Sequence, residues 1–287
     1  MSFPRTSVGG LSLSRMIVGT NWFLGFSHCS DAEDKLIKQS VAADYKKLAD
    51  ILEVFFKAGV DTVMGLISVP PLHQAIQEAE QRTGVKGIVV ATPGFNVTPD
   101  LPSKGFNLSE VGKILDDQKR LGTAICMPHQ STTDALVDRC THTLRHCDQL
   151  CAEIRKRGMI PGLSTHMPEA IVYADESKLD VETYISIFNS MGFLMQVEVD
   201  WTSRIIAEAA KPVMTIKPFA SGQIRPFQGF TFVWNAIRPC DMVTVGTMTP
   251  DEARECVEMS LAILERRQSG VKLQETRSKA AVKKGKR

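Results

Sequence analysis

Six polar residues are placed at the ends of predicted strands and carry side chains that can bind or transform a small molecule. They are Asn21, Asp61, His129, His166, Asn189 and Lys217. Carboxylates and imidazoles transfer protons, and a desolvated lysine attacks carbonyl groups. If these strands are parallel, the side chains gather where parallel barrels build their active sites. Catalytic roles are expected for Asp61, His129, His166 and Lys217.

The same side chains allow other chemistries. Asp61, His129 and His166 could ligate a divalent metal and leave one position open for water. No His-x-His or His-Glu-x-x-His spacing supports this, so no residue is assigned as a metal ligand. Lys217 could form a Schiff base if burial lowered its pKa, or it could pair with Asp61. The interpretation we favour is a hydrogen-bonded pair of Asp61 and His129.

Eight β-branched runs alternate strictly with amphipathic helical stretches. Strands are predicted at residues 15–20, 60–64, 87–92, 123–129, 159–164, 181–189, 212–217 and 241–246, with 193–200 as a rival for the sixth. Helices are predicted from a cap at Ser40 to Gly59 and at 71–81, 108–121, 142–157, 167–174, 201–210 and 249–266. Strict alternation predicts a parallel sheet with helical crossovers. A closed (β/α)8 barrel is favoured over an open, doubly wound sheet, because no Gly-x-Gly-x-x-Gly opens a helix.

The chain of 287 residues is expected to form one barrel domain over residues 1–270. Residues 271–287 are rich in lysine and arginine and are expected to form a disordered tail. Three long connections, 21–39, 93–107 and 219–239, follow predicted strands. Long connections at the top of a barrel are expected to serve binding.

Composition limits the classes of function. A formal net charge of +2 gives no reason to expect a nucleic-acid partner, and no apolar run approaches the length of a membrane span. Seven cysteines without small-domain disulfide spacing indicate reduced thiols in a cytoplasmic protein. The expected partner is a small-molecule ligand, and a homo-oligomer formed through helix faces stays open.

A helix start near the end of the eighth predicted strand offers a further binding feature. Gly246 and Thr247 could present backbone amides to a phosphate there. Thr249 and Glu252 also match a capping box, which explains both residues without a ligand. Both interpretations stay open.

Five segments form an ordered set along the chain: residues 3–20, 58–62, 162–166, 213–222 and 245–252. This set resembles the N-terminal hairpin and several barrel strands of the aldo-keto reductases. The resemblance implies a (β/α)8 barrel with an N-terminal β-hairpin. It also implies carbonyl reduction by a nicotinamide cofactor, with a Tyr proton donor beside Lys, Asp and His.

Matched by motif, the catalytic positions of that family are only partly retained. Asp61 and His129 fall at the Asp and His positions, whereas Leu66 falls at the Tyr and Pro93 at the Lys. Leucine has no exchangeable proton, and proline has no charge to lower the pKa of a phenol. Standard reductase chemistry is therefore not expected.

The cofactor positions implied by the resemblance are Ser164, Gly222, Gly246, Thr247 and Glu255. Thr165 and Ile185 fall where the family has amide side chains. Glu252 falls where an Arg favours an adenosine 2′-phosphate, which a carboxylate repels. If a nicotinamide nucleotide binds, NADH is expected rather than NADPH.

Three functions follow from these observations. The first is an enzyme with altered chemistry at the barrel top. The second is a non-catalytic barrel that binds a metabolite or partner, whose mouth would be filled by Trp22 or Phe95. The third is a metal-dependent hydrolase or isomerase.

Overall fold

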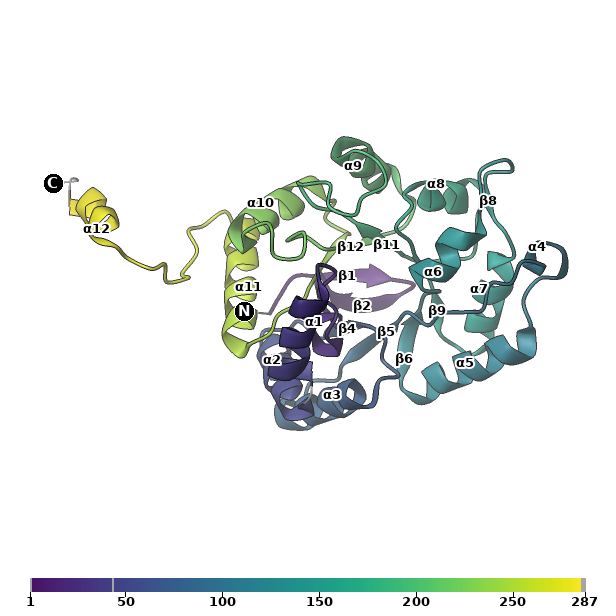
Figure 1. The fold of residues 1–287 in the computed structure, drawn as a ribbon, viewed down its shortest axis with the longest axis horizontal. Coiled ribbons are helices and arrows are strands. Elements are labelled where there is room, and N and C mark those ends of the chain that lie inside the picture. Colours follow the sequence, from purple (N-terminus) through teal and green to yellow (C-terminus); the bar gives the residue numbers. More distant parts are fainter. Residues whose placement is uncertain (1, 43, 285–287) are drawn as a thin grey trace.

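A computed structural model describes residues 2–42 and 44–284, and its central feature is a closed parallel barrel (Figure 1). The sheet order is β10-β11-β12-β13-β3-β4-β5-β6-β9. Its strands are β3 (Met16–Gly19), β4 (Thr62–Gly65), β5 (Ile88–Ala91), β6 (Thr123–Cys126), β9 (Ile160–Pro161), β10 (Leu163–Ser164), β11 (Tyr184–Ile187), β12 (Val213–Ile216) and β13 (Met242–Val245). The predicted (β/α)8 barrel is confirmed.

The barrel closes at Gly162, which separates β9 from β10. β9 pairs with β6 and β10 pairs with β11, so the two short pieces together make the fifth strand. A Cβ atom at position 162 would lie 2.7 Å from the Thr183 carbonyl oxygen and 2.8 Å from Met127 Cε. Only glycine lets the two neighbouring strands approach this closely.

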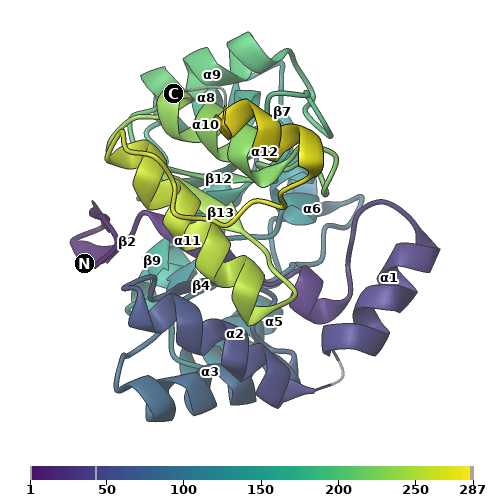
Figure 2. The same ribbon diagram turned by 90° about the vertical axis from the view of Figure 1, so that its left-hand side faces the viewer.

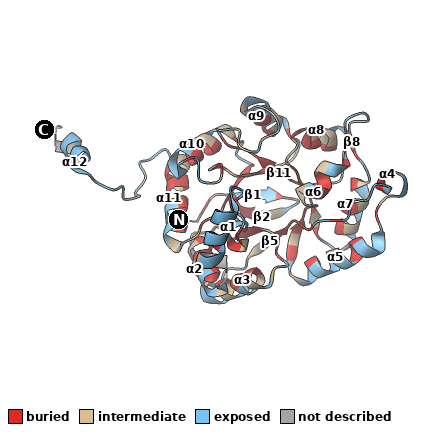
Figure 3. Cartoon of the chain, viewed as in Figure 1, coloured by how far each residue is buried: buried red, intermediate tan, exposed pale blue. Residues whose placement is uncertain are grey.

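Helices surround the barrel and turn their apolar faces toward it (Figure 3). They are α2 (Tyr45–Lys57), α3 (Pro70–Thr83), α5 (Leu108–Arg120), α7 (Cys147–Lys156), α8 (Glu169–Glu176), α9 (Val199–Glu208), α10 (Pro226–Ala236) and α11 (Pro250–Leu264). None of the described helices is long and apolar enough to cross a membrane.

A β-hairpin covers the amino ends of the barrel strands. It consists of β1 (Arg5–Val8) and β2 (Leu11–Ser14), which pair antiparallel. Val8 and Leu13 are buried and pack against the side chains that fill the barrel interior. Figure 2 views the barrel from the side, with the hairpin at one end and α1 (Asp31–Ile37) at the other. The predicted N-terminal hairpin is confirmed, and it leaves the opposite end for a ligand.

Most predicted elements form within a few residues of their expected bounds. The sixth strand lies inside 181–189 as predicted, while the rival segment 193–200 holds a loop and the first turn of α9. The cap of α2 is Asp44 rather than Ser40, because the Asp44 carboxylate accepts from Lys46 N at 2.9 Å. The predicted helix at 142–157 begins only at Cys147, since His146 has a left-handed φ of 56°. A small hairpin, β7 (Val137–Asp138) and β8 (Thr143–Leu144), stands before it.

The long connections contain helices that were not predicted. The first holds η1 (Trp22–Leu24), α1 and η2 (Lys38–Ala42), and the second holds α4 (Leu101–Lys104). The third holds α10, whose buried residues Phe230, Val233 and Trp234 have the spacing of one helix face. Two short helices, α6 (Gln130–Thr133) and η3 (Asp134–Leu136), follow β6. In the basic tail, α12 (Arg277–Lys284) stands apart from the barrel (Figure 1).

Candidate functional site

The carboxyl ends of the barrel strands surround a cavity of about 680 Å³. Its wall takes residues from all eight strands, or from the connections directly after them, and from α10 and α11. A (β/α)8 barrel places its binding groups at this end, because the connections that follow the strands are free to vary without disturbing the core.

The structure brings most of the predicted site residues together in this cavity. The residues that line it are His129, His166, Lys217, Ser164, Gly222, Gly246, Thr247 and Glu255. Asn21 and Ile185 also belong to its wall. Asn189, by contrast, is fully buried, and its amide binds the backbone of Met191 and Phe193.

Asp61 lies at the other end of the barrel, and its assignment to the mouth is wrong. It directly precedes β4 and forms an ion pair of 2.7 Å with Arg5 of the hairpin. Its other carboxylate oxygen accepts from Ser14 N at 3.3 Å. The motif placed Asp61 one strand length too early: Met64 and Gly65 are the β4 residues that reach the cavity.

Without Asp61, the interactions predicted for it do not form. The His129 ring is held instead by Ser131, whose Oγ lies 2.8 Å from Nδ1. Neither the Asp61–His129 pair nor the Lys217–Asp61 pair exists. Across residues 2–42 and 44–284, no three His, Cys, Asp or Glu side chains come together as metal ligands.

Lys217 follows β12 and points a partly buried ammonium group into the cavity. Within the described chain no carboxylate forms an ion pair with it; its Nζ lies 3.4 Å from His28 Nε2. Burial lowers the pKa of Lys217 to about 8, since desolvation penalises the charged amine. Its backbone adopts a φ of 60°, an uncommon value for a residue with a side chain.

Three histidines share the cavity with this lysine. Burial, helped by the positive charge of Lys217, lowers the pKa of His28 and of His129, and lowers the pKa of His166 to about 4. All three imidazoles are therefore neutral at physiological pH, and each ring keeps one nitrogen that can accept a proton.

His28 reaches the cavity through a connection that crosses the barrel mouth. The Asn21 side-chain nitrogen lies 2.7 Å from His28 Nε2. Ser221 Oγ donates to the Ser27 carbonyl oxygen and ties this connection to the one after β12. Asp34 accepts from Ser27 N at 2.7 Å and so fixes the other side of the turn.

Three threonine hydroxyls on the cavity wall have no hydrogen-bond partner in the described chain. Thr20, Thr244 and Thr247 are 1%, 6% and 2% exposed, and each Oγ1 is buried. Buried hydroxyls are normally paired, since an unpaired one costs roughly 1–3 kcal/mol. All three residues lie on the neighbouring strands β3 and β13 or in the connections directly after them.

The side chains matched to the family's Tyr and Lys contribute no chemistry here. Leu66 is partly buried and does not line the cavity, while Pro93 is buried and accepts from His129 N through its carbonyl oxygen at 2.9 Å. Thr165 is also turned away, since its hydroxyl donates to Asp134 at 2.5 Å. The cavity groups that can transfer protons are Lys217, the three histidines and the carboxylates of Glu252 and Glu255.

The capping box at the start of α11 forms. Glu252 N donates to Thr249 Oγ1 at 3.1 Å, and Met248 N donates to the Glu252 carboxylate at 2.7 Å. Both side chains thus have structural partners, although Glu252 also borders the cavity. The mouth is open: Trp22 lines the wall instead of filling it, and Phe95 packs edge-on against Phe106.

Several cavity residues escaped the sequence analysis. His28 was not among the candidate site residues, although it lies in a connection already expected at the barrel top. Thr20 and Thr244 gave no signal, because threonine is common in buried strands. Arg225, which caps α10 beside the cavity, stood inside what was expected to be an irregular loop.

No family model and no curated protein matches the chain. Solved structures do. A proposed aldo-keto reductase from Pseudomonas aeruginosa is 18% identical with a TM-score of 0.63, over 91% of this chain and 96% of that one. A proposed 2,5-diketo-D-gluconic acid reductase B is 15% identical with a TM-score of 0.53, over 96% and 95%. Aldose reductase from Giardia lamblia is 10% identical with a TM-score of 0.52, over 98% and 91%. The chain thus has the (β/α)8 barrel fold seen in aldo-keto reductases.

Proposed function

We propose that the protein is a barrel enzyme that binds a small anionic organic molecule in the carboxyl-end cavity. The observation that carries this is an unpaired lysine beside unpaired hydroxyls. A partly buried ammonium without a counter-ion is unfavourable until an anion meets it. An anionic ligand that also accepts hydrogen bonds from Thr20, Thr244 and Thr247 would supply the missing partners of the whole wall.

The chemistry that this cavity supports is proton transfer and nucleophilic attack. Lys217 has a pKa of about 8, close to the range in which an acid–base group works at neutral pH. The neutral histidines can accept protons from a ligand or from Lys217. The arrangement of these side chains does not favour a metal-dependent hydrolase or isomerase. The open mouth favours a cavity that admits a ligand over one that Trp22 or Phe95 fills.

A nicotinamide nucleotide is a second candidate ligand. It is favoured by the extent of the cavity, which runs from Lys217 past Gly222 and Gly246 to Glu255. Glu252 offers no cation for a 2′-phosphate, so the wall fits NADH better than NADPH. No tyrosine lines the cavity, so reduction by the usual proton donor is not expected.

The test is calorimetric titration of the purified protein with NADH, then NADPH, then small carboxylates and phosphates. Binding that weakens about tenfold or more in Lys217→Met supports the anionic cavity, since a hydrogen bond to a charged group contributes roughly 1.5–3 kcal/mol. Lys211→Met is the matched control, because Lys211 lies at the amino end of the same strand and pairs with Glu182. Equal affinity in both variants, or no binding by any ligand, would reject the proposal.

A further inference from the structure

We propose that Lys217 is a nucleophile that forms an imine with a ligand aldehyde or ketone carrying an anionic group. This rests on the proposed function, because the ligand must first enter the cavity. The amine lies on the cavity wall at the carboxyl end of a barrel strand. The backbone of Lys217 fixes its position, and no carboxylate among the described residues pairs with its charge.

The backbone of Lys217 fixes where the amine is delivered. Its φ of 60° belongs to the left-handed region, which costs a residue with a side chain on the order of 1 kcal/mol. Ala220 N donates to the Lys217 carbonyl oxygen at 3.0 Å, and the buried Pro218 follows directly. This turn aims the side chain across the mouth toward the connection that carries His28.

The environment of the amine favours its neutral form. Desolvation is the cause of its lowered pKa, and no carboxylate in the described chain stabilises the ammonium. A larger fraction of the Lys217 amine than of an ordinary lysine is therefore unprotonated near neutral pH, and only the unprotonated amine attacks a carbonyl carbon. The titratable groups that face it are His28 after β3, His129 after β6 and His166 after β10, all neutral in this range.

His28 is placed to move the protons that imine formation requires. The Asn21 side-chain nitrogen can only donate, so the His28 Nε2 atom that it meets at 2.7 Å is the accepting nitrogen of the ring. The same Nε2 atom lies 3.4 Å from Lys217 Nζ. A ring nitrogen has one lone pair, so Nε2 can take a proton from the amine when the Asn21 hydrogen bond opens, and it can return the proton later.

The reaction balances without any redox partner. The Nζ lone pair attacks the carbonyl carbon, a C–N bond forms, and the C=O electron pair moves to oxygen. A proton passes from nitrogen through His28 to this oxygen and gives a carbinolamine. The remaining N–H proton of the carbinolamine then passes through His28 to the hydroxyl group, which leaves as water while the nitrogen lone pair forms the C=N bond. The unpaired hydroxyls of Thr20, Thr244 and Thr247 would bind the anionic group of the ligand after rotating toward the cavity, because each Oγ1 is buried.

The experiment uses glyoxylate, the smallest oxo acid, because it fits any cavity that admits a larger one. The full-length protein is incubated with glyoxylate and sodium cyanoborohydride, which reduces the imine but spares the free carbonyl. Mass spectrometry of the intact protein and of its peptides then locates the carboxymethyl group. We expect preferential modification of Lys217, at a rate that rises with pH through about 8.

Two lysine variants serve as controls. Lys217→Arg keeps the charge but cannot form an imine, so the preferential adduct should disappear. Lys211→Arg removes a lysine of the same strand that lies outside the cavity, so the adduct should persist. His28→Ala should slow trapping by about tenfold to a hundredfold without abolishing glyoxylate binding. Modification spread over exposed lysines, at Lys217 no faster than at Lys211, would overturn the proposal.

Calorimetry with glyoxylate alone separates this inference from the proposed function. Binding without trapping at Lys217 would overturn the imine and leave the anionic cavity standing. No binding by glyoxylate or by the other anions, together with no trapping, would reject both. Trapping at Lys217 that is lost in Lys217→Arg supports both.

Discussion

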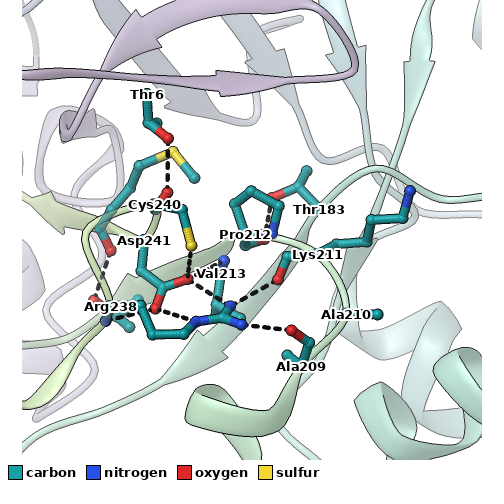
Figure 4. A network of polar contacts seen from close by, with 12 residues as sticks. Thr6, Thr183, Ala209, Ala210, Lys211, Pro212, Val213, Arg238, Cys240 and Asp241 are labelled. Atoms are coloured by element: carbon teal, nitrogen blue, oxygen red, sulfur yellow. Dashed lines mark hydrogen bonds and ion pairs between the residues drawn. The ribbon is translucent and has the colours of Figure 1, made fainter.

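The two ends of this barrel differ in how their buried charged groups are paired. At the amino end, Asp241 is fully buried and each carboxylate oxygen is engaged, with Arg238 as its ion-pair partner at 2.8 Å (Figure 4). Asp61 is paired with Arg5 in the same manner. At the carboxyl end, no carboxylate within residues 2–42 and 44–284 pairs with Lys217, and three threonine hydroxyls have no hydrogen-bond partner among these residues.

This difference separates stability from binding. A buried charge whose hydrogen bonds are all made within the protein needs no ligand. Removing one member of such an ion pair leaves the other charge unpaired in an apolar environment. A buried polar group without a hydrogen-bond partner lowers the stability of the folded protein. Such groups are tolerated at functional sites, where a ligand supplies the missing partner. The paired charges at the amino end therefore contribute to stability, and the cavity at the carboxyl end is the proposed ligand site.

The largest expected effect is loss of stability on breaking the amino-end network. Asp241→Ala leaves Arg238 without its carboxylate and frees Val213 N, which donates to Asp241 at 2.8 Å. We expect the free energy of unfolding in urea to fall by about 3–5 kcal/mol, with ligand affinity of the folded protein unchanged. Asp251→Ala, at a largely exposed carboxylate, should change it little. Equal losses in the two variants would contradict the comparison.

Lys217→Met should act in the opposite direction. The folded pKa of Lys217, about 8, lies below its ordinary value of 10.5, so the unfolded chain binds more protons between these limits. The penalty for charged Lys217 is full below pH 8 and disappears as pH rises toward 10.5. In urea unfolding, the free energy of unfolding of the variant should exceed that of the wild type by about 1 kcal/mol at pH 7. This difference should disappear by pH 10.5. A difference that stays constant from pH 7 to 10.5 would show that burial does not shift the pKa of this amine.

Asp61→Asn tests whether the two ends are independent. It removes the charge that meets Arg5 at the amino end, so we expect a loss of about 1–2 kcal/mol in urea unfolding. Ligand binding should stay at the wild-type level, whereas His129→Ala, inside the cavity, should weaken it. If Asp61→Asn weakened binding as much as His129→Ala, the two ends would be coupled.

Asp61 also marks the limit of what the sequence could predict. Alternating strands and helices were enough for the barrel, since each element buries one periodic face. The cavity could be placed because Lys217, His129 and His166 all follow strands. Asp61 failed because the motif match assigned it to the mouth, although the predicted strand 60–64 already places it near the amino end. The unpartnered hydroxyls of Thr20 and Thr244 could not be predicted, because satisfaction depends on neighbours from other strands.

The smallest effect compares two threonines on adjacent strands. Thr215 Oγ1 donates to the Met242 carbonyl oxygen at 2.8 Å, whereas Thr244 Oγ1 has no partner in the described chain. Thr215→Val should lower the free energy of unfolding by about 1 kcal/mol, and Thr244→Val should leave it unchanged or slightly raised. Binding should respond in reverse, with only Thr244→Val weakening the affinity for an anion. Matched urea and calorimetric titrations decide this, because a structural role for Thr244 would lower stability and spare affinity.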